Sequence, residues 1–385
     1  MTCNPLLFEA SVVMDKFMRI LLLTSSMSAG GAERVASTLA NAWASRGYQV
    51  VLMPTFSGRL ECYYDLFSDV RLVYLADLVS TRTRSAVNQF SRLCALRQFI
   101  ASEQPTVIVS FLPNVNVAAA IASFGLAIPI VVCERTDPFV CPSPWKLRVA
   151  CRFAYPLADA LMVQTQAVAS KYMLVGRALR RIRVIPNPVP PQFVELVPLG
   201  GTPGERQLLA VGRLSIEKQF DVLIRVFARL ASRHSGWSLK IIGEGPLRAD
   251  LRQQIAALRL HSRVELSGRV ADIADEFAHA DAFVLTSSFE GFPNALLEAM
   301  AAGLPCVTFD CPSGPREITE DGQVALLVAL NDEVALELAL ERLMADDELR
   351  KALGTEARAS VLRRFALKEI LEKWDSLFRE VGCRH

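Results

Sequence analysis

Short aliphatic runs separate longer amphipathic segments along the first half of the chain. Such runs, rich in Val, Ile and Leu, are typical of parallel strands that are buried on both faces. They occupy residues 18–26, 48–54, 106–112, 128–134 and 160–165. Between the first two runs, residues 32–47 place Val35, Leu39 and Trp43 at helical spacing and end at Gly47. Repetition of this strand–helix–strand pattern predicts a mostly parallel α/β sheet.

The same pattern begins again after a proline- and glycine-rich segment at residues 184–207, which is typical of a linker. Further strands are expected at residues 207–214, 238–243, 263–268, 281–287 and 304–310. The sequence therefore predicts two doubly wound, Rossmann-like domains, residues 1–190 and 191–365, followed by a C-terminal helical segment at 366–385. Ligands of such sheets bind outside the carboxyl ends of the strands. Two facing edges of this kind would form a central cleft that holds two substrates.

Composition supports two globular domains. The chain has 385 residues, of which 51% are hydrophobic, and this length exceeds what one ordinary core organises. Residues 1–190 contain 19 Lys and Arg against 11 Asp and Glu, a net charge of +8, whereas residues 191–385 contain 23 against 29, a net charge of −6. A basic first half favours an anionic partner, such as a phospholipid surface or a phosphorylated acceptor. The alternative is a surface imbalance without function.

Cysteine spacing and hydropathy exclude several classes of protein. The nine cysteines contain no CxxC pair, so we expect reduced thiols in a cytosolic protein rather than a disulfide framework or a zinc site. The uncharged run at residues 104–133 is interrupted by Pro and Asn, which indicates strand, helix and strand rather than a membrane span. Residues 1–16 do not resemble a secretory signal. Met1, Met14 or Met18 could each be the true start.

Two glycines, Gly30 and Gly31, follow the first predicted strand in the segment SSMSAGGAERV. Small residues there would let backbone N–H groups and the start of the next helix approach a phosphate or a sugar. The segment is not GxGxxG, and the second strand ends without the acidic residue that holds a ribose in NAD-binding domains. A plain strand-to-helix turn is the alternative.

Two cations, Arg213 and Lys218, follow the first strand of the second domain in the segment VGRLSIEKQFD. Such a pair can clamp a diphosphate, Arg through its planar fork and Lys as a point charge. The alternative is a solvated pair beside Glu217. The loop at residues 243–246 follows the next strand and could face a nucleotide base, although it is only a turn signal by itself.

Two carboxylates lie eight residues apart in the segment SSFEGFPNALLEAMAAG: Glu290 at the end of a strand and Glu298 within the next helix. A carboxylate accepts hydrogen bonds from two vicinal hydroxyls, and a helix N-terminus favours phosphate. Both acids can therefore be interpreted as ligands of one nucleotide sugar. The alternative makes Glu290 a helix-start acid and Glu298 an exposed helix residue.

Taken together, these motifs resemble a family 4 retaining glycosyltransferase of the GT-B fold. The resemblance rests on Glu290 and Glu298 as E-x7-E, preceded by GRLSIEKQFD and IIGEGPLR and followed by CPSGPREI. GGAERV, IPNPV and the C-terminal helix fit as well, so that the resemblance covers nearly the whole chain. CERTDP, ADALMVQTQAV and DCPSGPREI are similar to bacterial enzymes that build lipid-linked oligosaccharides, lipopolysaccharide and exopolysaccharide.

The resemblance implies a role for each matching position. Arg213 and Lys218 would bind the donor diphosphate and stabilise the departing charge, Glu290 would contact the transferred sugar, and Glu298 would hold the ribose hydroxyls. The remaining donor-binding positions would be Gly30, Gly31, Gly243, Gly245, Val270, Gly291, Phe292, Pro293 and Asn294. The last helix, within residues 366–385, would cross back to the first domain.

One departure from the family concerns histidine. Many relatives carry a histidine near the sugar in the first domain, but the four His of this chain all lie in its second half. The corresponding region contains Glu134 and Arg135. We hypothesise that one of them orients the acceptor or the sugar, and a salt-bridged pair at a strand end is the alternative.

The resemblance also implies the reaction. The enzyme would move a hexose or N-acetylhexosamine from a nucleotide-diphosphate sugar, UDP-linked or else GDP-linked, to a hydroxyl of a growing glycan that polyprenyl diphosphate carries. Transfer would retain the anomeric configuration by front-face attack. No Asp-x-Asp triplet occurs, so no metal or other cofactor is expected. The protein would be cytoplasmic and peripheral on the anionic inner face of the cytoplasmic membrane, without a nucleic-acid partner.

Two other functions remain as alternatives at this point. A nucleotide-sugar epimerase shares the fold, and a new glycosidic bond in the product would exclude it. A non-catalytic nucleotide-sugar-binding subunit of a polysaccharide assembly complex would bind UDP without turning over any donor.

Overall fold

A computed structural model of the chain describes residues 18–56, 62–79, 86–140, 143–175, 179–196 and 205–383. It consists of two compact units. The first contains the chain up to Pro186 together with Ile370–His385, and the second contains Asn187–Glu369. The candidate starts Met1 and Met14 and part of the proline-rich segment lie outside the described residues.

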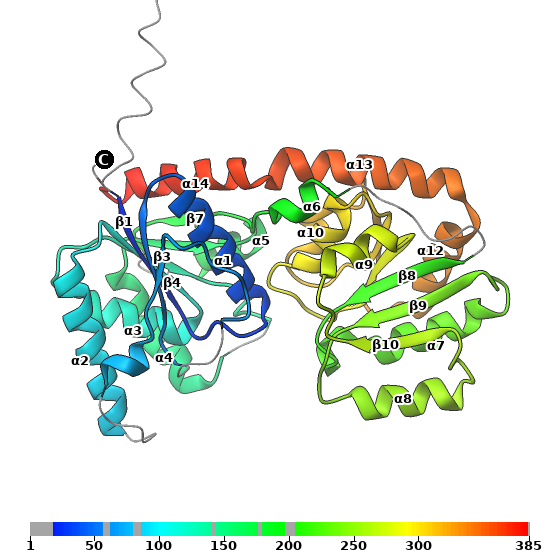
Figure 1. The fold of residues 1–385 in the computed structure, drawn as a ribbon, viewed down its shortest axis with the longest axis horizontal. Coiled ribbons are helices and arrows are strands. Elements are labelled where there is room, and N and C mark those ends of the chain that lie inside the picture. The colour runs from blue at the N-terminus through cyan, green and yellow to red at the C-terminus, as the bar shows by residue number, and fades with distance from the viewer. Residues whose placement is uncertain are drawn as a thin grey trace, which may run out of the picture. The chain divides into compact units, whose positions relative to one another are not determined.

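The first unit is built on a seven-stranded parallel sheet with the strand order β3-β2-β1-β4-β5-β6-β7 (Figure 1). Its strands are β1 (Arg19–Thr24), β2 (Gln49–Pro54), β3 (Val70–Leu72), β4 (Val107–Phe111), β5 (Ile130–Cys133), β6 (Ala160–Val163) and β7 (Ile182–Val184). At its centre, Leu21 of β1 lies opposite Val51 on one side and Ile108 on the other. The order confirms the α/β class, because parallel neighbours need helical crossovers.

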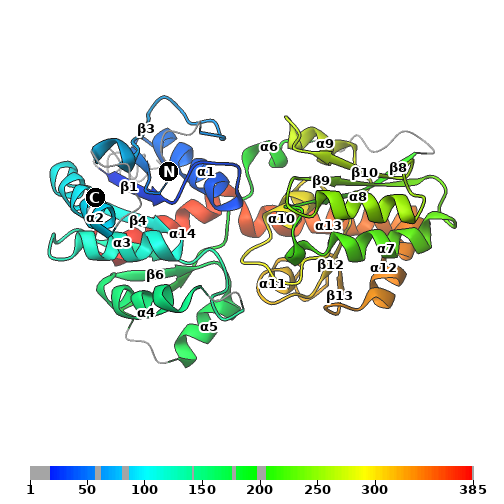
Figure 2. The ribbon, with the colours of Figure 1, turned by 90° about the horizontal axis from the view of Figure 1, so that it is seen from below.

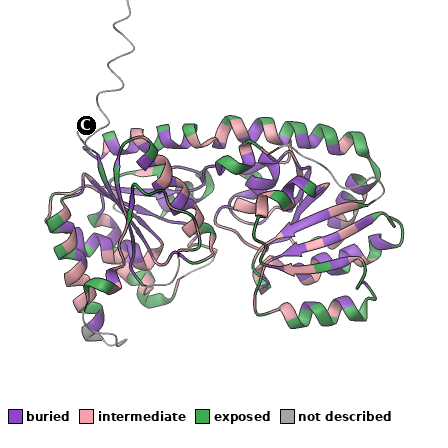
Figure 3. Cartoon of the chain, in the orientation of Figure 1, coloured by how far each residue is buried: buried purple, intermediate pink, exposed green. Residues whose placement is uncertain are grey.

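Helices cover both faces of this sheet, whose strands β4, β5 and β6 are wholly buried, whereas the edge strands β3 and β7 are largely not (Figure 3). They are α1 (Gly31–Ser45), α2 (Ala86–Glu103), α3 (Pro113–Ser123), α4 (Trp145–Ala154), α5 (Gln166–Leu174) and α14 (Leu367–Glu380), with short 3-10 turns η2 (Leu75–Leu78) and η3 (Tyr155–Leu157). Alternate strand residues such as Leu21 and Leu23 pack with α2, α3, α4 and α5 in one core. Side chains alternate across a sheet, so the intervening residues Ile20 and Leu22 are buried on the opposite face.

The C-terminal helix α14 packs against α1 of the first unit. The Trp374 ring meets the Trp43 ring edge to face, with centroids 5.6 Å apart, and the Phe378 ring lies 5.8 Å from Trp43. Arg46 adds an ion pair of 2.7 Å to Asp375. The last segment of the chain therefore completes the core of the unit that the first segment begins.

The second unit has a six-stranded parallel sheet with the order β10-β9-β8-β11-β12-β13. Its strands are β8 (Arg206–Val211), β9 (Trp237–Ile242), β10 (Val264–Gly268), β11 (Ala282–Leu285), β12 (Cys306–Phe309) and β13 (Leu326–Val328). Neighbouring residues of one strand enter different cores. Leu208 packs with α7, α8 and α12, whereas Leu209 packs with α6, α9, α10 and α13. A doubly wound domain was predicted, and this two-faced sheet confirms it.

The helices of the second unit lie on both faces of its sheet, with α7 and α8 on the side opposite α9 and α10 (Figures 1 and 2). They are α6 (Pro191–Val194), α7 (Phe220–Ala231), α8 (Arg248–Ala257), α9 (Ile273–His279), α10 (Asn294–Ala301), α11 (Pro315–Ile318), α12 (Glu333–Ala345) and α13 (Asp347–Phe365), with the 3-10 turn η4 (Ile216–Lys218).

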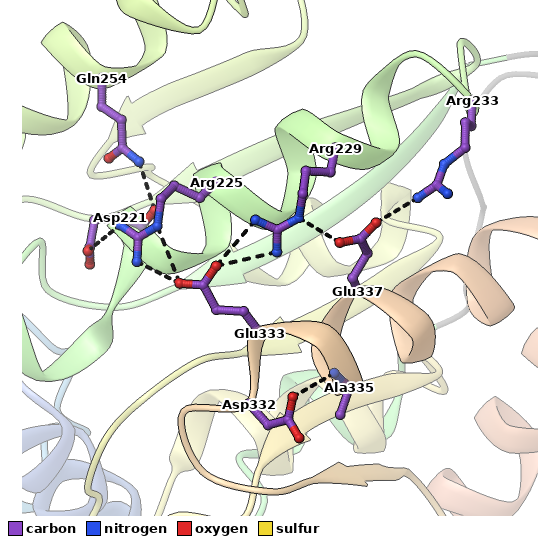
Figure 4. A network of polar contacts seen from close by, with 9 residues as sticks. All are labelled: Asp221, Arg225, Arg229, Arg233, Gln254, Asp332, Glu333, Ala335 and Glu337. Atoms are coloured by element: carbon purple, nitrogen blue, oxygen red, sulfur yellow. Dashed lines mark hydrogen bonds and ion pairs between the residues drawn. The ribbon is translucent and has the colours of Figure 1, made fainter.

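A ladder of charged side chains joins α7 to α12 on the outside of this unit (Figure 4). Arg225 forms an ion pair of 2.8 Å with Glu333, and Arg229 reaches both Glu333 at 3.3 Å and Glu337 at 2.5 Å. Arg233 continues the ladder to Glu337 at 2.8 Å. Each carboxylate accepts from two guanidinium groups, which makes the ladder a network rather than a set of isolated pairs.

Hydropathy is also as the sequence predicts. The uncharged run at 104–133 forms β4, α3 and β5, and in the described ranges no helix is both long and apolar enough to cross a membrane. The seven described cysteines are free thiols, five of them buried. The hydrophobic pattern did not identify helix α9. It also missed the strands β3, β7 and β13, which have three residues each.

Candidate functional site

The candidate site lies where β8 and β11 end in the second unit. These parallel strands are neighbours in the sheet, so their carboxyl ends meet at one edge. The loop after β8 carries Arg213 and Lys218, and the loop after β11 carries Glu290. The topology therefore brings the loop of Arg213 and Lys218 to the loop of Glu290, although Arg213 and Glu290 are 77 positions apart in the sequence.

Hydrogen bonds connect the two loops and fix their relative position. The Thr286 hydroxyl donates to the Lys218 carbonyl oxygen at 2.8 Å. The Ser288 N–H donates to the Glu217 carbonyl oxygen at 2.7 Å. Because Thr286 is buried, little water competes for its bond. The loop that carries the cations is thus held against the loop that carries the acid.

Lys218 and Glu290 form a half-buried ion pair at this junction. Lys218 Nζ donates to Glu290 Oε1 at 2.6 Å, and the Ser287 hydroxyl donates to the same oxygen at 2.7 Å. The two charged side chains are 19% and 13% exposed. Since an ammonium group has three N–H donors, Lys218 can keep Glu290 and still donate to a ligand.

Arg213 lies in the same loop but is exposed. In the part of the chain that the structure describes, its side chain shows no ion pair. Glu217 accepts a hydrogen bond from Ser215 at 2.5 Å, while Lys218 bonds to Glu290. The alternative of a solvated cation pair beside Glu217 therefore fails for Lys218, whose carboxylate partner is across the junction.

Gly243 and Gly245 are required by a close approach of two backbones. Gly243 has a φ of +145°, and a Cβ there would overlap the Gly212 carbonyl oxygen. A Cβ at Gly245 would overlap the Leu214 carbonyl oxygen. The loop after β9 thus rests directly on the Arg213 loop. The role at a nucleotide base stays a prediction, and the packing already explains why both positions are glycine.

Glu298 lies in α10, which begins at Asn294 after Pro293, as predicted. Its residue exposure is 1%, so the alternative of an exposed helix residue is wrong. Burial removes this carboxylate from bulk water, which distinguishes it from an ordinary acid on the surface of a helix. Asn294 accepts a hydrogen bond of 2.6 Å from Asn187, which ties the start of α10 to the beginning of the unit.

The loop after β12 also reaches this site, and sequence reasoning gave it no role. Ser313 donates to the Glu290 carbonyl oxygen at 3.5 Å, and a Cβ at Gly314 would overlap Pro293. The buried Cys311 lies close enough for the Glu290 charge to act on it: burial first, and then that charge, raises the pKa of its thiol to about 12. The segment CPSGPREI, noted for its resemblance, was the signal for this contact.

Gly291, Phe292 and Val270 are the other donor-binding candidates of the second unit. Gly291 and Phe292 continue the backbone from Glu290 towards α10, and Phe292 is buried. Val270 follows β10 and is partly buried against the core of α6, α9, α10 and α13. Within the described ranges, no group of three or more His, Cys, Asp or Glu side chains is arranged to hold a metal ion.

Gly30 and Gly31 belong to the first unit, at the start of α1. A Cβ at Gly30 would overlap the Glu33 carboxylate, which accepts a hydrogen bond from Ser26 at 2.7 Å. The Tyr64 hydroxyl donates to the Gly30 carbonyl oxygen at 2.9 Å. A carboxylate therefore lies beside the predicted phosphate position, and a hydroxyl would suit this turn better than an anion.

Glu134 and Arg135 follow β5 in the first unit, and both are buried. Glu134 accepts hydrogen bonds from the hydroxyls of Tyr155 at 2.6 Å and Tyr172 at 3.0 Å. Burial and the Glu134 charge raise the pKa of Tyr155 well above its usual range. The Arg135 guanidinium lies 3.7 Å from the centre of the Phe111 ring, and burial lowers its pKa to about 10. These contacts favour a positioning role over direct contact with a substrate.

Comparison with protein families assigns both units. Residues 30–188 match the model of a glycosyl transferase 4-like domain, and residues 198–360 match that of glycosyl transferases group 1. The two matches follow the division of the chain into two units. They contain all of the candidate residues.

Individual relatives are bacterial polysaccharide enzymes. A Campylobacter jejuni GalNAc-alpha-(1->4)-GalNAc-alpha-(1->3)-diNAcBac-PP-undecaprenol alpha-1,4-N-acetyl-D-galactosaminyltransferase is 27% identical over 368 residues, which cover 94% of this chain and 99% of that protein. An exopolysaccharide phosphotransferase of Streptomyces coelicolor is 39% identical over 233 residues, which cover 60% of this chain but only 24% of that protein.

Solved structures give the same fold. The Anabaena protein HepE in complex with UDP and glucose has a TM-score of 0.77 and 21% identity, and the match covers 94% of this chain and 99% of that one. This likeness identifies the GT-B architecture. Together with the two family matches, it leads to the conclusion that the chain belongs to the group 1, family 4-like glycosyltransferases of the GT-B fold.

Proposed function

We propose that this glycosyltransferase is a retaining enzyme that moves a hexose or N-acetylhexosamine from a UDP-sugar to a hydroxyl of a growing glycan. The observation that carries the proposal is the Lys218–Glu290 pair, held at the meeting point of two strand ends beside Arg213. A cation and a carboxylate at one edge match a ligand with both a diphosphate and sugar hydroxyls.

Arg213 and Lys218 have the charge needed for the donor diphosphate. Arg213 is exposed and can present its guanidinium fork to two phosphate oxygens, while Lys218 donates to a third. In this proposal no metal is required, because the two cations stabilise the departing diphosphate. Glu290 accepts hydrogen bonds from the transferred sugar through its oxygen that Lys218 does not bind.

Glu298 is proposed to hold the ribose hydroxyls. Its burial in α10 favours a site in which the ligand excludes water. The N-terminus of α10 and the backbone from Gly291 to Asn294 would donate to phosphate. Gly243, Gly245 and Val270 would border the base, and Gly30 and Gly31 would approach the donor from the first unit.

The proposed reaction is a front-face transfer, as the resemblance to retaining family 4 enzymes implies. The oxygen of the acceptor hydroxyl attacks the anomeric carbon from the face on which the bond to the diphosphate oxygen breaks. The bonding electrons leave with that diphosphate oxygen, which also takes the hydroxyl proton. No residue forms a covalent intermediate, so the protein acts by orientation and charge stabilisation. Glu134 and Arg135 are proposed to position the acceptor side through their buried contacts.

The proposed acceptor is a glycan on polyprenyl diphosphate at the cytoplasmic face of the membrane. The name of the Campylobacter relative includes an undecaprenol-linked acceptor. The net charge of +8 on residues 1–190 supports an anionic surface as a second partner. The protein would then be peripheral and cytoplasmic.

The decisive test is a product assay with UDP-sugars and a short polyprenyl-diphosphate-linked glycan, with and without EDTA. We expect a new glycosidic bond with the anomeric configuration of the donor, at a rate that EDTA leaves unchanged. An inverted product, or activity that chelation removes and Mg²⁺ or Mn²⁺ restores, would contradict the mechanism. A free epimerised nucleotide sugar would identify an epimerase, and nucleotide binding without any product would identify a binding subunit.

A further inference from the structure

Helix α4 (Trp145–Ala154) on the outside of the first unit has an unusual outward face (Figure 2). Its inner face is ordinary, because Leu147, Cys151 and Ala154 pack into the core with α2, α3 and α5. The outward positions would normally be polar. Here the strongly exposed residues include Trp145 at 69% and Phe153 at 71%.

Apolar and cationic side chains share that outward face. Trp145, Val149 and Phe153 recur every four residues, and Arg148 and Arg152 lie between them in the same i, i+3, i+4 pattern. All five are exposed. The helix therefore presents an apolar ridge flanked by guanidinium groups, which we call the α4 face, and Lys146 beside it adds a third cation.

The charge of the α4 face is of one sign. Residues 145–154 contain three cations and no acid. Asp137 and Asp159, the acids on either side in sequence, form ion pairs with Lys171 at 2.6 Å and with Arg180 at 2.8 Å. Among the described residues, no ion pair neutralises Lys146, Arg148 or Arg152. The Lys146 ammonium lies 5.7 Å from the centre of the Trp145 ring.

The apolar and cationic side chains of the α4 face together favour one class of partner over others. A second copy of this chain would place three cations against three cations, which is unfavourable. A nucleic acid would use the cations but would leave Val149 and Phe153 without an apolar partner. The surface of an anionic bilayer satisfies both, because it offers phosphates to Arg and Lys and an apolar boundary to Trp and Phe.

We propose that α4 is a membrane-docking helix that lies on an anionic lipid surface. Trp145, Val149 and Phe153 enter the boundary between headgroups and acyl chains, and Lys146, Arg148 and Arg152 contact lipid phosphates. The proposal deepens, and rests on, the lipid-linked acceptor proposed above, because it says which surface of the first unit meets the membrane.

Trp145 provides a direct probe. The chain has four tryptophans, and the other three, Trp43, Trp237 and Trp374, are at most 4% exposed. Vesicles of phosphatidylcholine with phosphatidylglycerol should shift the emission of the full-length protein to shorter wavelength. Lipids with a quencher near the headgroup should quench it. Trp145→Phe should lose both signals and still sediment with the vesicles.

Variants separate the two contributions of the α4 face. Arg148→Gln with Arg152→Gln should weaken binding roughly 25-fold, because each cation near an anionic surface contributes about a factor of five. Trp145→Ser with Phe153→Ser should weaken it on the order of a hundredfold. Matched controls are Phe90→Ser, an aromatic residue of α2 with 69% exposure, and Arg252→Gln on exposed α8. Both controls should bind like wild type.

Four results would overturn the proposal. Sedimentation without any change in Trp145 emission would place the contact elsewhere, for instance at the exposed residues Met173, Leu174 and Val175 at the end of α5. Equal binding to phosphatidylcholine alone would remove the role of the cations. Protein that stays unbound at low salt, or that dimerises through α4, would remove the docking role altogether.

A parallel measurement keeps this inference distinct from the proposed function. UDP should raise the melting temperature of the α4 variants as much as that of wild type, because α4 is not part of the candidate donor site. A UDP effect without vesicle binding would reject only the docking helix. Vesicle binding with the Trp145 signal, but no UDP effect, would reject only the proposed donor.

Discussion

Two neighbouring residues that have no proposed part in the reaction hold the Lys218–Glu290 pair in position. Ser287 donates to the same carboxylate oxygen as Lys218, and Thr286 fixes the Lys218 backbone from the neighbouring strand end. A cation held in this way is oriented before a ligand arrives. Preorganised charge of this kind is usually the largest single contribution to transition-state stabilisation.

Lys218→Met tests whether that cation acts on the leaving diphosphate. We expect transfer to slow about a hundredfold or more, because a preorganised donor is lost in the transition state. Steady-state kinetics with a UDP-sugar would measure it. Lys240→Met is a matched control, since Lys240 forms a similar ion pair of 2.6 Å with Glu276, with both side chains 17% exposed. Equal rate losses in both variants would show that Lys218 acts only through stability.

Gly243→Ala tests the packing of the two loops beneath the site. A Cβ there overlaps the Gly212 carbonyl oxygen, and φ is +145°, so both overlap and backbone strain oppose it. We expect a loss of about 2–4 kcal/mol in the free energy of unfolding. Gly47→Ala is the control: its φ is +86° with nothing within 4 Å, so only about 1–2 kcal/mol should be lost. Urea denaturation distinguishes the two, and equal losses would contradict the close approach.

At the scale of elements, the hydrophobic pattern predicted the longer strands but not the shortest ones. Apolar runs in the sequence predicted β1, β4 and β11, which have four to six residues, whereas β3, β7 and β13 have three residues each, too few to show a period. Helix α9 was missed although Asp272 caps it by accepting from two N–H groups. That acid ahead of an apolar helical turn was a usable signal.

The charge ladder between α7 and α12 predicts a dependence on salt and pH. Arg229→Ala removes the arginine that pairs with both Glu333 and Glu337. We expect the free energy of unfolding to fall by about 1 kcal/mol or less at low salt, and by less as salt screens the charges. Hydrogen bonds from Arg225 and Arg229 lower the pKa values of Glu333 and Glu337 below the usual 4.5. The contribution of the ladder is therefore present above that pH and is lost as pH falls through the lowered values.

Thermal unfolding of wild type and Arg229→Ala, from neutral pH to below pH 4.5, measures this effect. The difference between the two proteins should close at the acidic end and in high salt. Lys351→Ala is the control, since Lys351 pairs with Glu348 on α13 and its side chain is 73% exposed. A difference that persists in acid and in salt would mean that Arg229 stabilises through packing instead.

Helix α14 predicts that the last residues of the chain stabilise its first unit. Trp374→Ala deletes a buried ring that contacts Trp43 edge to face, and we expect a loss of about 3–5 kcal/mol in the unfolding of that unit. Glu372→Ala, on the exposed side of the same helix, should change it by about 0.5 kcal/mol or less. Chemical denaturation followed by circular dichroism would show the difference. Similar stabilities would contradict the packing of α14 on α1.

At the scale of the whole molecule, the sequence predicted the repeated architecture and named Lys218 and Glu290, which the structure brings together at the candidate site. The two successive strand–helix patterns and the spacing of Glu290 and Glu298 were visible in the chain itself. The burial of Glu298 and the bond from Ser313 to Glu290 were not, because each depends on segments that come together only in the folded unit. Spacing predicts which residues share a site, and tertiary packing decides what each of them contacts.

The most direct test of the central claim is a thermal-shift screen of wild type and Glu298→Gln with UDP, GDP and their hexose and N-acetylhexosamine conjugates. We expect the UDP series to stabilise wild type by about 2.7–4.1 kcal/mol at a hundred to a thousand times the dissociation constant. We expect a clearly smaller effect in the variant, whose lost charge weakens its hold on the ribose. No shift with any nucleotide, or an equal shift in both proteins, would contradict the assignment of this buried carboxylate to the donor.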